Sequence, residues 1–143
     1  MTDRDAAGAT RKRILIVYGT SYGQTAKIAN RMRDILDTYG FDVVVTNADA
    51  ADPDLDPASF DGVLVGGSLI KGVHQPSVQA FVTRHCAGLN DLPSAFFSVS
   101  ASAASEDEAG QEDARRAMDR FLTETGWNPR MRTTVAGAIA YTK

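Results

Sequence analysis

Cysteine and histidine are scarce in this sequence, which has one cysteine and two histidines among 143 residues. A single cysteine cannot form an intramolecular disulfide, so we expect a reducing, cytoplasmic compartment. His85 and Cys86 are adjacent and point in different directions on a helix, and few other ligands remain. We therefore predict no metal site.

Long apolar runs and basic stripes are also lacking. The longest apolar runs are about strand length, far below the roughly 20 residues that a membrane-spanning helix needs. The apolar stretch after Arg13 leads into a turn of small polar residues, so we expect no secretory signal. The net charge of −3, without a basic face, argues against nucleic-acid binding. The length instead suits one compact domain with one core.

Strands and helices alternate along the chain after a polar tail, residues 1–12, that we expect to be disordered. The expected strands are 13–18, 41–46, 62–65, 95–99 and 133–139. The first expected helix spans 24–39, and the second begins at Pro76. The third begins after Ser105, which forms a capping box with Glu108, and stops at Gly126. Segment 47–60 is expected to be a loop with at most one short helical turn. Apolar strands that alternate with amphipathic helices predict an α/β fold, a three-layer doubly wound parallel sheet of five strands.

The turn at residues 19–25 is rich in glycine and hydroxyl side chains. The first amides of a helix lack internal partners and lie at the positive end of the helix dipole, so the turn can hold an anion. Gln24 follows Gly23 where a triphosphate-binding loop has lysine, and the dinucleotide fingerprint G-x-G-x-x-G is absent. Neutral donors suit one terminal monophosphate, and flavin mononucleotide (FMN) is the candidate. Helix capping alone is the alternative.

Three loops of small, polar residues are expected at the carboxyl ends of the strands, namely 19–25, 66–75 and 98–105. Ligands of doubly wound sheets bind at this edge, and small side chains leave room for a flat ring against the backbone. We interpret Lys71 and His74 as solvated loop residues; stabilising the negative charge of a reduced flavin is the alternative. Cys86 is interpreted as a small core residue.

These segments resemble the flavodoxin-like family. The resemblance rests on Gly-Thr-Ser-Tyr-Gly-Gln-Thr at 19–25, Gly-Gly-Ser at 66–68, His74, and Leu-Pro-Ser-Ala-Phe-Phe-Ser-Val at 92–99. Segments 77–99 and 135–141 are similar to its branch of menaquinone-dependent protoporphyrinogen oxidases. The resemblance covers residues 13–141 and implies the strand order 2-1-3-4-5, with FMN as cofactor.

That branch implies protoporphyrinogen IX as electron donor and a membrane quinone as acceptor, in haem biosynthesis. By position, the resemblance assigns the FMN phosphate to Thr20, Ser21, Tyr22, Gly23, Gln24 and Thr25. It assigns one side of the flavin ring to Gly67, Ser68, Leu69, Ile70, Lys71 and Gly72, and the other side to Ser98, Ser100, Ala101 and Ser102. No side chain is assigned as acid or base. An electron-carrier flavodoxin that docks to redox proteins, or an interaction module without flavin, are the alternatives.

The family fold normally ends with a helix after the last strand, and the sequence stops at Lys143. We therefore expect the domain at 13–143 to be C-terminally incomplete, with the first helix covering its face of the sheet almost alone. Apolar surface left on that face favours a homo-oligomer. Peripheral membrane contact is expected only through sequence that is absent here. Ile70 and Lys71 replace an arginine and an aromatic that are frequent in the branch, which leaves the donor open.

Overall fold

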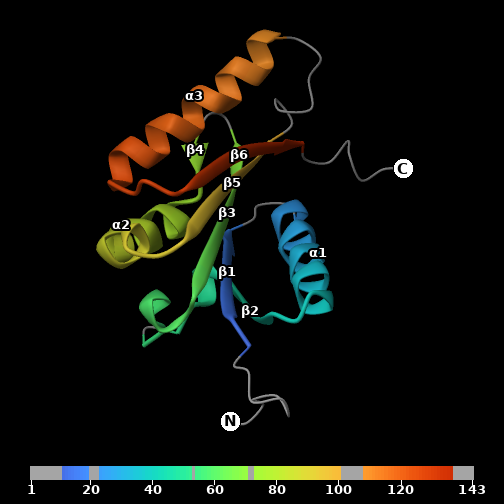
Figure 1. The fold of residues 1–143 in the computed structure, drawn as a ribbon. Coiled ribbons are helices and arrows are strands. Elements are labelled where there is room, and N and C mark those ends of the chain that lie inside the picture. The colour runs from blue at the N-terminus through green and yellow to red at the C-terminus, as the bar shows by residue number, and fades with distance from the viewer. Residues whose placement is uncertain (1–10, 20–22, 53, 71–72, 101–107, 137–143) are drawn as a thin grey trace.

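The computed structural model describes residues 11–19, 23–52, 54–70, 73–100 and 108–136. In these ranges, five parallel strands form one sheet in the order β2-β1-β3-β5-β6 (Figure 1). Their bounds are Arg13–Gly19 for β1, Asp42–Asn47 for β2, Gly62–Ile70 for β3, Ser94–Ser100 for β5 and Met131–Ala136 for β6. A two-residue strand, β4 (Val73–His74), pairs antiparallel with the end of β3. The predicted doubly wound order, 2-1-3-4-5 for the parallel strands, is confirmed.

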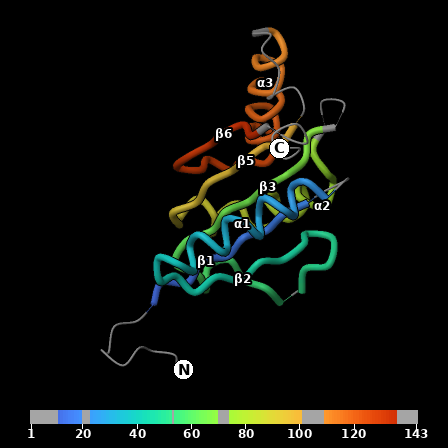
Figure 2. Tube along the Cα trace, turned by 90° about the vertical axis from the view of Figure 1, so that its right-hand side faces the viewer, coloured from blue at the N-terminus to red at the C-terminus, as the bar shows by residue number. Residues whose placement is uncertain are grey.

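Helices cover both faces of the sheet. The α-helices of the described ranges are α1 (Gln24–Thr38), α2 (Pro76–Asn90) and α3 (Glu108–Thr125). Figures 1 and 2 show α1 across one face, with α2 and α3 on the other. Gly40 and Gly126 follow α1 and α3 with φ of 93° and 79°, a left-handed conformation that glycine adopts without strain and that ends a helix. No helix of the described ranges is both long and apolar enough to cross a membrane.

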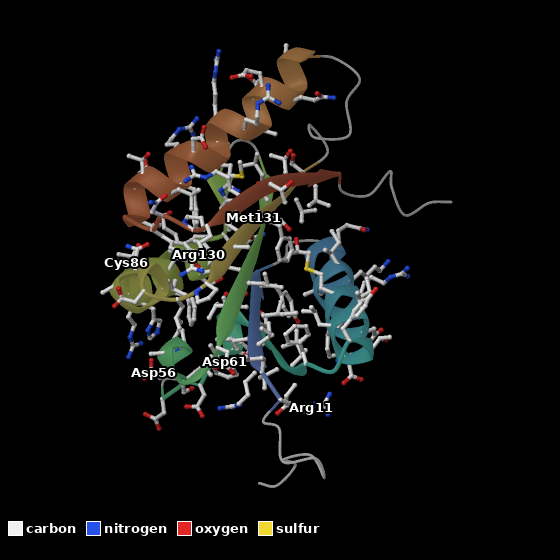
Figure 3. The ribbon with its side chains drawn as sticks, in the orientation of Figure 1. Arg11, Asp56, Asp61, Cys86, Arg130 and Met131 are labelled. Atoms are coloured by element: carbon white, nitrogen blue, oxygen red, sulfur yellow. The ribbon has the colours of Figure 1, made fainter. Side chains whose placement is uncertain are left out.

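The larger core lies between the sheet and the pair α2 and α3. It includes Leu15, Val17, Val65, Val78, Phe96, Phe121 and Trp127. A smaller cluster of Ile28, Phe97 and Val99, with Met32, Leu64 and Val135 packed against it, lies on the α1 face. An apolar groove of about 330 Å³ remains beside it, lined among others by Leu36, Leu64 and Met131. Figure 3 marks Met131 at the start of β6, where 65% of it is exposed, so α1 leaves apolar surface on its face.

Several expected boundaries differ from the structure. Segment 47–60 contains two 3-10 helices, η1 (Ala48–Ala50) and η2 (Pro57–Ser59), so the expectation of at most one turn was wrong. Asn47 and Asp56 each accept a backbone N–H two residues on, which caps the two turns. Strand β3 is longer than the expected 62–65, and β6 begins at Met131 rather than at residue 133. The expected tail at 1–10 and the end of the last strand, 137–139, lie outside the described residues.

Candidate functional site

The three segments predicted to contact a cofactor meet at the carboxyl edge of the sheet. Gly19 of β1 pairs with Gly67 of β3, and Gly67 pairs with Ser98 of β5. The chain runs from β1 to β2 on one side and reaches β3 on the other, so strand order reverses beside β1. Such a reversal is where open α/β sheets bind ligands. The edge at β1, β3 and β5 is therefore the candidate site.

The start of α1 has the properties of an anion-binding site. Gly23 precedes the helix with φ of 85°, and within the described residues no side chain caps this end and no acidic residue lies in its first turn. The Oε1 atom of Gln24 is buried and has no hydrogen-bond partner among the described residues. A helix start that no described side chain caps fits an anionic group, whereas the Gln24 oxygen is an acceptor and fits a hydroxyl group beside it. Thr20, Ser21 and Tyr22 lie outside the described residues.

Thr25 and Ser68 join α1 to β3. Thr25 is fully buried, and its Oγ1 lies 2.6 Å from Ser68 Oγ. The backbone N–H of Ser68 donates to Gln75 Oε1 at 3.0 Å. These contacts set the start of α1 against the end of β3, while the two hydroxyls are occupied by each other.

The predicted site serines point to opposite faces of the sheet. Ser68 faces α1, whereas Ser98 lies on the other face, fully buried, with its Oγ 2.8 Å from His74 Nε2. Ser100 is buried as well, with 6% of it exposed. The structure thus brings Gly67, Ser68 and Ser98 to one edge but encloses both hydroxyls. Contacts of the predicted residues with a cofactor stay predictions, and Lys71, Gly72, Ala101 and Ser102 lie outside the described residues.

His74 is a core residue, so its interpretation as a solvated loop residue was wrong. Only 4% of it is exposed, and its ring contacts Phe96 and Phe121 at centroid distances of 5.4 and 4.9 Å. Burial, and next the charge of Arg120, lower its pKa from 6.5 to about 4. The imidazole is therefore neutral near pH 7. The sequence alone does not reveal this burial, because the ring of Phe121 that covers His74 comes from α3, far along the chain.

The loss of folding stability at acidic pH should depend in part on His74. In the unfolded chain His74 becomes protonated below about pH 6.5, whereas in the folded protein it stays neutral down to about pH 4. Stability from this group is complete above pH 6.5 and falls by up to about 3 kcal/mol as the pH drops to 4. His74→Phe, which keeps a ring beside Phe96 and Phe121, should remove this part of the pH dependence. Urea unfolding at pH 7 and 4.5 measures it; equal losses in the variant and the parent would contradict it.

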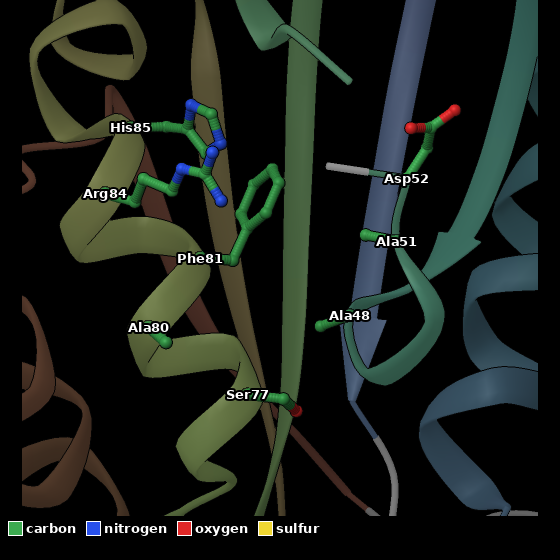
Figure 4. Close-up of a pocket in the computed structure, with 8 residues that line it drawn as sticks. All are labelled: Ala48, Ala51, Asp52, Ser77, Ala80, Phe81, Arg84 and His85. Atoms are coloured by element: carbon green, nitrogen blue, oxygen red, sulfur yellow. The ribbon is translucent and has the colours of Figure 1, made fainter. Parts of the chain in front are cut away.

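A second concavity lies between α2 and the segment after β2 (Figure 4). Its volume is about 240 Å³, and its lining consists of Ala48, Ala51, Asp52, Ser77, Ala80, Phe81, Arg84 and His85. Ser77 Oγ is buried and has no partner within the part of the chain that the structure describes, and the His85 ring packs on Phe81 at 4.7 Å. Burial, with a contribution from Arg84, lowers the His85 pKa. The sequence analysis did not find this pocket, because only the tertiary structure sets segment 48–52 opposite α2.

Comparison with known proteins agrees with the flavodoxin-like fold. A model of the flavodoxin domain family matches residues 15–143. Protoporphyrinogen IX dehydrogenase (quinone) of Escherichia coli strain K12 is 31% identical over 128 residues, which is 89% of this chain and 69% of that protein.

Similar solved structures are flavodoxins. A short-chain flavodoxin associated with a non-canonical PDU bacterial microcompartment has a TM-score of 0.67 at 15% identity, covering 88% of this chain and 84% of that one. Fusobacterium nucleatum flavodoxin bound to flavin mononucleotide has a TM-score of 0.56 at 12% identity, covering 87% and 69%. At these identities the likeness establishes the fold.

Proposed function

The chain belongs to the flavodoxin domain family, and on this premise we propose that it binds FMN at the carboxyl edge of its sheet and acts as an FMN-dependent oxidoreductase. We further propose protoporphyrinogen IX as electron donor and a quinone as acceptor, after the name of the Escherichia coli relative. The start of α1, which no described side chain caps and which has no acidic residue in its first turn, is the observation that carries the cofactor assignment.

The residues at the start of α1 suit the phosphate end of FMN. The first-turn amides supply donors, and no acidic side chain lies in that turn to repel an anion. The side-chain amide of Gln24 can donate to a phosphate oxygen or accept from a ribityl hydroxyl. Thr25 contributes indirectly, because its contact with Ser68 fixes the helix start against β3.

Bound FMN supplies the redox chemistry, because its ring system takes up and returns electrons. The chain binds and orients it. The backbone at residues 67–70 and the segment after Ser100 are proposed to border the ring. His74 is neutral near pH 7, so it adds no positive charge there. For Lys71, contact with a reduced flavin or with porphyrin propionates stays the alternative to a solvated loop residue.

Flavin titration tests the cofactor assignment. We expect the protein to bind FMN with quenched flavin fluorescence, and to bind FMN about 30- to 100-fold more tightly than riboflavin, because charge-assisted hydrogen bonds to the phosphate each contribute roughly 1.5–3 kcal/mol. Riboflavin is the matched control, since it lacks only the phosphate. A protein that takes up neither flavin refutes the proposal.

An electron carrier is the competing function, since the similar solved structures are flavodoxins. Anaerobic mixing of the FMN-loaded protein with protoporphyrinogen IX and a water-soluble menaquinone analogue separates the two. An enzyme should produce porphyrin fluorescence faster than free FMN at the same concentration. A rate equal to the free-FMN control would favour the carrier.

A further inference from the structure

Two consecutive residues at the junction of β4 and α2 each hold the carboxyl end of a neighbouring strand. His74 Nε2 lies 2.8 Å from Ser98 Oγ on β5, and Gln75 Oε1 accepts the backbone N–H of Ser68 on β3. Ser68 in turn contacts Thr25 of α1 through its hydroxyl. Polar contacts therefore connect α1, the proposed phosphate-binding helix, with β3 and β5, the strands that lead to the proposed position of the flavin ring.

We propose that His74 and Ser98 form a positioning pair that fixes the end of β5 against β4 and thereby shapes the ring end of the flavin site. The proposal rests on the proposed FMN function. Neither side chain is a catalytic residue, because Ser98 is fully buried and His74 is 4% exposed. The pair acts through the backbone of the two strands that it joins.

Neighbouring residues hold the His74 ring in the position from which it contacts Ser98. The His74 ring packs against both Phe96 and Phe121, which stack on each other at a centroid distance of 4.8 Å, and a Cβ added at Gly67 would lie 3.4 Å from its Cδ2. The ring thus passes close over Gly67 to reach Ser98, the residue that pairs with Gly67 in the sheet. Water cannot replace the bond at this depth, so losing it leaves a buried polar atom unpaired and the strand end less constrained.

Strand β5 offers a matched control at its opposite end. Ser94 is also buried, and its Oγ accepts a hydrogen bond from another ring nitrogen, Trp127 Nε1, at 3.0 Å. Ser94→Ala and Ser98→Ala therefore make the same chemical change on the same strand, and each removes a contact to a ring nitrogen. They differ in position, since Ser94 lies at the amino end of β5 and Ser98 near the carboxyl edge.

The experiment compares flavin affinity with stability in both variants. Each should unfold at a lower urea concentration than the parent protein. Only Ser98→Ala should weaken riboflavin and FMN binding, by about tenfold, the lower end of what losing a supporting polar partner costs at a binding site. It should also alter the visible circular dichroism of the bound flavin. Ser94→Ala should keep both dissociation constants within twofold of the parent.

His74→Phe provides a second route to the same result. It should weaken riboflavin binding as Ser98→Ala does, and combining the two should add little, because both remove one contact. Ser98→Ala and His74→Phe proteins that bind both flavins like the parent would overturn the positioning role while leaving the FMN proposal intact. A parent protein that binds neither flavin overturns both.

Discussion

Gly66→Ala is expected to destabilise the domain by about 3 kcal/mol, the upper end for overpacking a core. A Cβ at this position would lie 2.1 Å from Cζ of Phe97 and within 2.7 Å of both its Cε atoms. Gly66 is paired on both sides, with Tyr18 of β1 and Phe97 of β5, so its backbone has little freedom to shift. Urea unfolding followed by Trp127 fluorescence measures the loss.

Gly67→Ala is the matched control for this prediction. The nearest atom to a Cβ there is Cδ2 of His74 at 3.4 Å, an ordinary contact, so we expect a loss below about 1 kcal/mol. Phe97→Leu tests the cause, because leucine lacks the clashing ring atoms. On that background Gly66→Ala should cost less than half as much. An unchanged cost would show that the ring of Phe97 is not responsible.

Gln24→Glu is expected to weaken FMN binding about 30- to 100-fold, a prediction that rests on the proposed phosphate position. The change is nearly isosteric and places a negative charge beside the phosphate dianion, where repulsion over a few ångströms amounts to roughly 2–3 kcal/mol. Riboflavin binding should change by less than about threefold. An acidic residue in the first turn of a helix is favourable, which offsets part of the cost of burying the new charge.

Asn30→Asp makes the same amide-to-carboxylate change on α1, six residues further along and thus about 9 Å away. It should reduce FMN affinity only slightly, and less so as salt is raised. Fluorescence titration of both variants with FMN and riboflavin gives the four dissociation constants. Equal effects of Gln24→Glu on the two flavins would place the phosphate elsewhere.

Local sequence patterns predicted most of the fold. The start of the helix at Pro76 and the helix ends at Gly40 and Gly126 could be predicted, because proline and glycine restrict or free the backbone at their own positions. The strand order came from the family resemblance. Strand β3 was underestimated because Gly66 and Gly67 are typical of turns in isolation. They continue a strand here because β1 and β5 pair with them and the Phe97 ring fills the space over Gly66.

The candidate site was predicted in outline. The turn before α1 and the serines at the strand ends were identified from their small, polar character, and register places Gly19, Gly67 and Ser98 at one edge. The partners of those side chains were not predictable. Ser68 contacts Thr25 on one face, and Ser98 contacts His74 on the other.

The sequence by itself determined the alternation of strands and helices, and with it a turn rich in glycine and hydroxyl side chains that lacks the lysine of triphosphate sites. These properties follow from the spacing of apolar residues along the sequence and from residues that affect only the backbone close to them. Only the tertiary structure decided that His74 is buried and neutral and that it holds Ser98. Burial depends on which distant segments pack together: Phe121 of α3 and Phe96 of β5 enclose a histidine that precedes them by 47 and 22 residues.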